Sequence, residues 1–165
     1  MKQPILYVLG LFILLGATAL VLAGTGGGDS PDSYSASVLL AVENDFDFGT
    51  VPMQDGIVTH SFTLSNDGTE PVRIEKVYTS CMCTTAVVTD ASGNARGRFG
   101  MSGHGTPSRS NIIIAPGEQA AVEAEFDPAA HGPAGVGLAR RSIYLETNSQ
   151  KSPKVELRFS AVVIK

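Results

Sequence analysis

Apolar residues recur at every second position from Val38 onward, and this alternation constrains the fold of the chain more than any other feature. In the segment VTHSFTLS (58–65), valine, phenylalanine and leucine share one parity with His60, and threonine and serine occupy the other. A period of two places successive side chains on opposite faces of a β-strand. We therefore predict a half-buried strand here, with His60 as a hydrogen-bonded histidine of the core or its rim rather than a metal ligand.

Segments that alternate in the same way follow along the chain: AAVEAEFD (120–127), RSIYLET (141–147) and KVELRFSAVVIK (154–165). Turn-forming residues separate them, as in NDGTEP (66–71) and APGE (115–118). No stretch beyond residue 24 repeats with the period of a helix. The pattern predicts an all-β domain over residues 38–165, an immunoglobulin-like antiparallel β-sandwich of about seven strands, with an up-and-down barrel as the alternative.

The N-terminus carries an uncharged apolar run, residues 5–24. At 1.5 Å per residue, a helix of this length spans about 30 Å, the hydrocarbon thickness of a bilayer. We predict a transmembrane anchor or signal helix in residues 1–24, and Lys2 on its N-terminal side places the following domain outside the cytoplasm. Val21 and Ala23 form a small-residue cleavage pattern, so a cleaved signal peptide is the alternative; the length of the run favours a retained anchor.

The expected partners follow from this layout and from the charge. Residues 25–37 are rich in glycine and serine, which predicts a flexible linker. The net charge is −4 and the isoelectric point about 5.3, so nothing in the composition favours a nucleic-acid partner. We expect contact with the membrane through the N-terminal helix, and with a protein through loops or a sheet edge in the periplasm or at the cell surface.

Two long connections interrupt the alternation, at 89–111 and 127–140. Structureless loops of this length are uncommon inside a compact domain and are often functional. Phe99, beside Gly100, is expected to hold the first connection against the sandwich. We therefore expect functional residues in these two segments.

Both cysteines of the chain lie in SCMCTT (80–85). On a regular strand, Cys81 and Cys83 project to the same face with Cα atoms roughly 6.5 to 7 Å apart, at or beyond the limit for an unstrained disulfide. The parity of apolar residues changes between Ile74 and Val77, which indicates a β-bulge upstream of the thiols. A disulfide is disfavoured but stays open, and Met82 is expected to face away from the two sulfurs.

Two thiolates on one face suit a soft metal ion, Cu(I) or Zn(II). The glycine-rich loop GMSGHG offers a thioether and an imidazole, so the predicted ligand set is Cys81, Cys83, Met101 and His104. His131 is a further candidate, ranked below His104. The alternatives are that the cysteines are small buried core residues, or that they exchange disulfides with other thiols.

Several of these motifs together resemble a bacterial family. The run FDFGTV (46–51), the strand ending in NDG (66–68), the motif SCMCT (80–84) and the turn PG (116–117) are similar to the hallmarks of the domain of unknown function fifteen-seventy-three. That family is related to the Hydin-type and major-sperm-protein-type immunoglobulin-like sandwiches. The resemblance covers about residues 44–163 and implies a seven-strand exported sandwich, but it implies no activity.

No catalytic motif is visible in the sequence, such as a nucleophile elbow, a zinc-protease helix or a phosphate loop. The leading hypothesis is a membrane-anchored, extracytoplasmic binding or structural module that is not an enzyme. A metal-binding or metallochaperone-like module is the first alternative, and a thiol-disulfide redox protein is the second.

Overall fold

The computed structural model describes residues 34–105 and 107–165. The predicted anchor or signal helix (1–24) and most of the predicted linker (25–37) lie outside these residues. Within the described ranges, no helix is long and apolar enough to cross a membrane.

The described chain forms ten strands and two short 3₁₀ turns. They are β1 (Leu39–Ala41), β2 (Asp45–Pro52), η1 (Met53–Asp55), β3 (Val58–Asn66), β4 (Val72–Thr79), β5 (Thr84–Thr89), β6 (Ala95–Phe99), β7 (Arg109–Ile114), β8 (Gln119–Phe126), η2 (Gly132–Gly135), β9 (Gly137–Thr147) and β10 (Lys154–Ile164).

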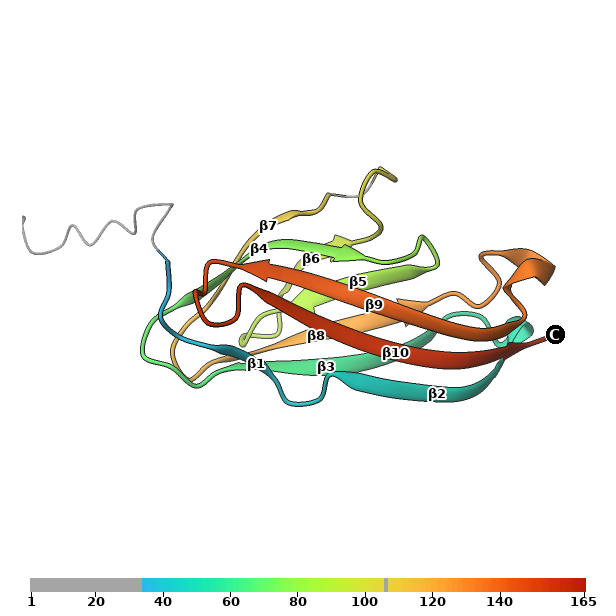
Figure 1. Cartoon of the computed structure of the whole chain (residues 1–165), viewed down its shortest axis with the longest axis horizontal. Coiled ribbons are helices and arrows are strands. Elements are labelled where there is room, and N and C mark those ends of the chain that lie inside the picture. The colour runs from blue at the N-terminus through green and yellow to red at the C-terminus, as the bar shows by residue number, and fades with distance from the viewer. Residues whose placement is uncertain (1–33, 106) are drawn as a thin grey trace, which may run out of the picture. The chain divides into compact units, whose positions relative to one another are not determined.

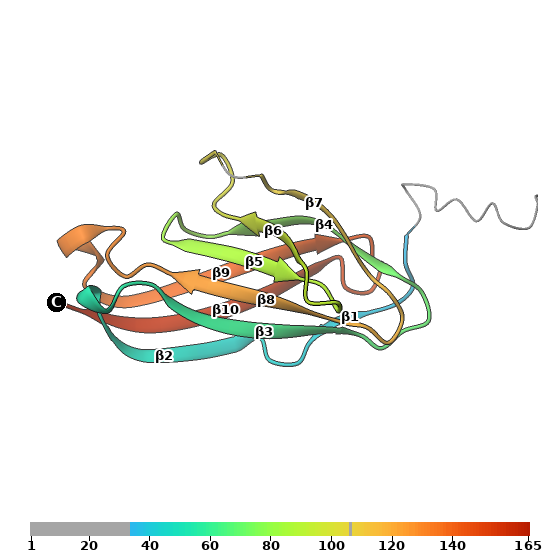
Figure 2. The same cartoon turned by 180° about the vertical axis from the view of Figure 1, so that it is seen from behind.

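The strands form two five-stranded sheets that pack as a sandwich (Figures 1 and 2). One sheet has the order β1-β3-β8-β5-β6, and the other has the order β2-β10-β9-β4-β7. The predicted all-β sandwich is confirmed. The prediction of about seven antiparallel strands is wrong in two respects, because there are ten strands and β2 pairs with β10 in parallel. The chain changes sheets between β1 and β2, which adds a strand and brings β2 alongside β10 in the parallel direction.

The core lies between the inward faces of both sheets, as the alternation requires. Phe62 and Leu64 of β3 are fully buried, as are Leu157 and Phe159 of β10. His60 sits at the rim of this core, where its ring stacks on Phe46 and its Nε2 lies 3.0 Å from a carboxylate oxygen of Glu43. The expected role of His60 is confirmed.

The two long connections hold more regular structure than predicted. Strand β6 and the start of β7 lie within 89–111, and η2 and the start of β9 lie within 127–140. Strand β6 is at a sheet edge and has the sequence ARGRF, so it lacks the apolar alternation that identifies a strand. Phe99 at its end is 3% exposed, and it anchors this segment in the core as expected.

The predicted β-bulge lies within β4. The pairing of β4 with both β7 and β9 shifts register between Ile74 and Lys76. After this shift Val77 and Thr79 are buried again, so the strand delivers its last residues to the core side just before the cysteine motif.

Candidate functional site

Cys81 and Cys83 lie in the turn that carries the chain from one sheet to the other. Strand β4 ends at Thr79 in one sheet, and β5 begins at Thr84 in the opposite sheet. The backbone N–H of Thr84 donates to the carbonyl of Cys81 (3.2 Å), which closes a four-residue turn. The expectation that the two cysteines lie on a regular strand is therefore wrong.

Thr79 holds this turn from inside the sandwich. Its buried hydroxyl lies 2.9 Å from the carbonyl oxygen of Cys81 and 3.1 Å from that of Thr84, within hydrogen-bonding distance of both. The carbonyl of Cys81 thus has the Thr79 hydroxyl as a possible donor in addition to the backbone N–H of Thr84. The exposed member of the turn is Met82, with 61% of its surface accessible.

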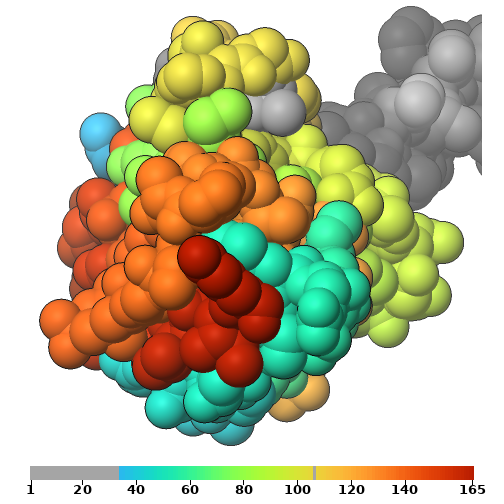
Figure 3. Space-filling model, turned by 90° about the vertical axis from the view of Figure 1, so that its right-hand side faces the viewer, coloured from blue at the N-terminus to red at the C-terminus, as the bar shows by residue number. Residues whose placement is uncertain are grey.

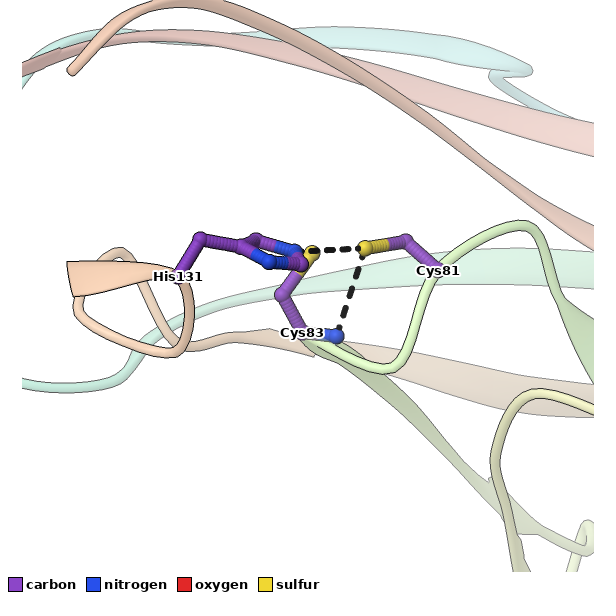
Figure 4. A group of neighbouring side chains, drawn as sticks. All are labelled: Cys81, Cys83 and His131. Carbon is purple, nitrogen blue, oxygen red and sulfur yellow. Dashed lines mark hydrogen bonds between the residues drawn. The ribbon is translucent and has the colours of Figure 1, made fainter. Parts of the chain in front are cut away.

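The two sulfur atoms lie within 4.8 Å of each other although the cysteines are part of a turn. Both thiols are free; Cys83 is buried and Cys81 is half-buried. The backbone N–H of Cys83 donates to the sulfur of Cys81 over 3.4 Å (Figure 4). The turn itself thus supplies a hydrogen bond that stabilises negative charge on Cys81.

His131 completes a three-residue cluster with the cysteines. Its Nε2 lies 3.2 Å from the sulfur of Cys81, and the potential ligand atoms of Cys81, Cys83 and His131 all lie within 4.8 Å of one another. Figure 4 shows the imidazole reaching the sulfurs from the neighbouring loop. That loop joins β8 to β9 and is tied to the turn, because the N–H of Asp127 donates to the carbonyl of Cys83 (2.9 Å). In Figure 3 the loop (orange) covers the end of the sandwich beside the C-terminal strand (red).

The predicted ligand His104 lies outside this cluster. It is exposed in the connection between β6 and β7, and its backbone N–H donates to the backbone carbonyl of Met101 (3.2 Å). The backbone of Met101 forms a bridge with Thr79, two residues before Cys81. The structure therefore brings His131 rather than His104 to the thiols, and Met101 as a ligand stays a prediction.

Arg141 is a member of the site that the sequence reasoning missed. It lies on β9 with the inward parity of Ala139 and Ile143, and its Nε donates to the sulfur of Cys83 over 3.0 Å. Its Nη1 donates to the carbonyl of Arg140 (2.8 Å). A charged residue at an inward position of an alternating strand was the available signal, but nothing in the sequence connects it with a turn 58 residues away.

The two thiols have opposite pKa shifts. Burial raises the pKa of Cys81, but hydrogen bonds from the side chain and backbone of Cys83, the contact with His131 and the positive charge of Arg141 together lower it to about 7. Burial is also the largest influence on Cys83 and, with the hydrogen bond to Cys81, raises its pKa despite the opposing effect of Arg141. The pair therefore shares one negative charge near neutral pH, and Cys81 is the more favourable place for it because it is less buried.

The donor set suits two kinds of chemistry. Bonds to sulfur near 2.3 Å allow two thiolates on one ion to be at most about 4.6 Å apart. The ligand atoms here lie within 4.8 Å of one another, so a small adjustment brings them within reach of one ion. Two sulfurs and one imidazole nitrogen are a soft donor set. A thiolate that is populated near neutral pH is also a nucleophile for disulfide exchange.

Comparison with protein families bears directly on this turn. Residues 39–97 match the family described as Protein of unknown function (DUF1573). The resemblance drawn from the sequence motifs is confirmed. The matched segment runs from β1 into β6 and includes both cysteines, whereas His131 and Arg141 lie beyond it. No curated protein matches the chain significantly.

Solved structures share the sandwich at low sequence identity. A protein of unknown function from Porphyromonas gingivalis W83 matches with a TM-score of 0.57 and 20% identity, covering 81% of this chain and 51% of that one. The VesB protease of Vibrio cholerae matches with a TM-score of 0.50 and 16% identity over 78% of this chain and 32% of that one. A PapD-like domain of human CEP192 matches with a TM-score of 0.48 and 16% identity, covering 86% of this chain and 96% of that one. The chain spans about half the length of the P. gingivalis protein and a third of VesB, and at these identities the first two likenesses show the fold alone.

Proposed function

We propose that this chain is an extracytoplasmic β-sandwich that acts by binding, and that its site holds one soft metal ion, Cu(I) or Zn(II), between Cys81, Cys83 and His131. The observation that carries the proposal is the convergence of two sulfurs and one imidazole nitrogen within 4.8 Å at one end of the sandwich. Thiolate and imidazole ligands select these ions over Mg²⁺ and Ca²⁺. This defined donor set is why we favour metal binding over the binding of an unspecified partner.

The proposed location follows from the N-terminal sequence. The apolar run 5–24 would hold the domain to a membrane as an anchor, or direct its export as a signal helix. Outside the cytoplasm, a free pair of neighbouring thiols meets oxidants, and a bound soft metal would protect both sulfurs. Intact mass of the mature protein distinguishes a retained anchor from a cleaved signal.

The metal site is tested by titrating the reduced full chain with Cu(I) against a coloured Cu(I) chelator under anaerobic conditions. We expect uptake of one equivalent, abolished in Cys81→Ser and Cys83→Ser and weakened in His131→Ala. The matched control is His104→Ala, which removes an exposed histidine outside the cluster and should leave uptake unchanged. No uptake by the wild type with both thiols reactive would refute the proposal, and loss of affinity in His104→Ala alone would refute the ligand set.

Thiol-disulfide exchange is the second candidate, favoured by the pKa of about 7 for Cys81. In this reaction the Cys81 thiolate attacks a small-molecule disulfide and releases one thiolate. The Cys83 sulfur then displaces the second leaving thiol and forms the Cys81–Cys83 bond. Incubation with a small disulfide followed by intact mass tests it: a loss of two hydrogen atoms per chain supports exchange, whereas persistence of both thiols rejects it.

A protein partner that contacts the loops or a sheet edge also stays a proposal. Strands β2, β6 and β7 are at sheet edges, and Ile113 on β7 is 49% exposed. Exposed edges present unpaired backbone groups that can pair with another chain.

A further inference from the structure

We propose that Arg141 makes the site selective for monovalent soft cations, Cu(I) and Ag(I), over Zn(II). The inference rests on the proposed metal site and names its ligand class. It starts from the contact between the guanidinium Nε of Arg141 and the sulfur of Cys83, at 3.0 Å.

The net charge of the occupied site favours a monovalent ion. Cys81 and Cys83 contribute two negative charges as metal-bound thiolates, His131 binds as a neutral imidazole, and Arg141 contributes one positive charge in contact with a ligand sulfur. A monovalent ion brings this group to net zero, whereas Zn(II) leaves it with one uncompensated positive charge. Cys81 is half-buried and His131 is exposed, so water reaches that side of the site, but Cys83 is 3% exposed. On the side of Cys83 and Arg141, an uncompensated charge is therefore costly because water solvates it poorly there.

The position of Arg141 fixes its charge next to the ion. The side chain leaves β9 on the inward face, between the buried residues Ala139 and Ile143, and its Nη1 is held by the carbonyl of Arg140. A guanidinium stays protonated throughout the physiological pH range. Its N–H can continue to donate to the Cys83 sulfur once that sulfur binds a metal, as hydrogen-bond donors around metal thiolates commonly do.

The number of ligands also favours Cu(I) and Ag(I) over Zn(II). Among the His, Cys, Asp and Glu side chains of the described residues, those that converge here are Cys81, Cys83 and His131. Structural zinc sites are almost always tetrahedral with four protein ligands. Cu(I) and Ag(I) accept two or three soft ligands, so the same donor set satisfies them. Charge and ligand number therefore favour the same class of ion.

The test measures the selectivity ratio of the reduced full chain for Ag(I) and Zn(II), each titrated alone in chloride-free buffer against a chelator of known affinity. We expect one equivalent of Ag(I) to bind much more tightly than Zn(II). In Arg141→Gln the neutral side chain keeps an N–H donor but lacks the charge. The ratio should then move toward Zn(II) by about tenfold or more, because one full charge near the ion is removed.

The matched control is Arg140→Gln. It removes the same charge from the neighbouring residue of β9, whose side chain is exposed on the outward parity of the strand. This variant should keep the wild-type ratio, and so should Arg141→Lys, which retains the charge. An equal shift in Arg140→Gln and Arg141→Gln would overturn the inference, because the effect would then reflect net charge alone.

The outcomes separate the two proposals. If the wild type binds neither Ag(I) nor Zn(II), the metal site itself is wrong. If the wild type binds both ions and Arg141→Gln leaves the ratio unchanged, the metal site stands and the selectivity role of Arg141 is refuted. Should Arg141→Gln fail to fold, the wild-type ratio still decides, because a preference for Zn(II) over Ag(I) contradicts the inference directly.

Discussion

Cys81 and Cys83 are two residues apart, but their sulfur atoms lie in different surroundings. The Cys83 sulfur is buried and accepts a hydrogen bond from Arg141, whereas the Cys81 sulfur is partly open to solvent and faces His131. Burial penalises a thiolate more strongly than a thiol. The charge of the pair therefore settles on the outer cysteine, which is also the one that reagents and ions reach first.

At the residue scale, we predict that alkylation of Cys81 by iodoacetamide has a pH midpoint near its pKa of about 7. The reacting species is the thiolate, so the rate follows the deprotonated fraction. Mass spectrometry of the peptide that contains residue 81, sampled from pH 5 to pH 10, measures the midpoint. Cys83→Ala removes the side-chain donor to Cys81 and should move the midpoint upward. A wild-type midpoint near 9 would contradict the prediction.

The same pKa shift predicts how stability depends on pH. Between pH 7 and pH 9, Cys81 is deprotonated in the folded chain and protonated in the unfolded chain, whose thiol has the ordinary pKa of 9.0. The unfolded state then binds more protons, so this linkage makes the free energy of unfolding rise with pH across the window and fall as pH drops through 7. Urea unfolding at pH 6, 7, 8 and 9 measures it. Cys81→Ser should show a shallower rise, and an identical pH profile in both proteins would reject the linkage.

At the element scale, the turn between β4 and β5 depends on the hydroxyl of Thr79. Thr79→Val keeps the shape of the side chain but leaves the carbonyls of Cys81 and Thr84 without this partner. We expect a loss of about 0.5 to 1.5 kcal/mol in the free energy of unfolding, the usual net contribution of one hydrogen bond, because the Cys81 carbonyl still accepts from the backbone N–H of Thr84. Chemical denaturation measures the loss, and Thr59→Val on the exposed face of β3 serves as the control.

The Thr79→Val variant also tests whether the turn positions the thiols. If the turn geometry loosens, the alkylation midpoint of Cys81 should rise toward 9, because the N–H of Cys83 no longer lies near its sulfur. Unchanged stability together with an unchanged midpoint would show that Thr79 does not support the site.

At the scale of the whole molecule, the two sheets are joined through an aromatic cluster in the core. The ring of Phe159 on β10 lies 5.5 Å from that of Phe126 on β8 in the opposite sheet, and 5.4 Å from that of Phe48 on β2. Phe159 is 1% exposed. It therefore packs between elements that are far apart in the sequence.

We predict that Phe159→Ala lowers the free energy of unfolding by about 3 to 5 kcal/mol, through lost burial and the cavity that remains. Because the cluster spans both sheets, unfolding should stay a single transition by circular dichroism and tyrosine fluorescence. The control on the same strand is Val162→Ala, whose side chain is 43% exposed and should cost far less. Equal losses in the two variants would mean that the cluster does not join the sheets.

The sequence by itself determined the elements whose pattern is local. Alternation identified β3, β8, β9 and β10, and the parity change located the bulge in β4. The two cysteines indicated where in the sequence the site lies, but not that they form a turn. These features are readable because burial of one face imposes a period of two on neighbouring residues. The sequence pattern did not identify the edge strand β6, because most of its side chains are not buried and show no alternation of apolar residues.

Only the tertiary structure decided which residues meet at the thiols. From the sequence, His104 ranked above His131 as a ligand, and the inward parity of Arg141 did not connect it with the cysteines. The hydrogen bond from Asp127 to Cys83 brings the β8–β9 loop and His131 to the turn, and the inward face of β9 brings Arg141 to Cys83. Such contacts depend on how two sheets stack and on which ends coincide, and these properties follow from packing of the whole chain rather than from any short stretch of it.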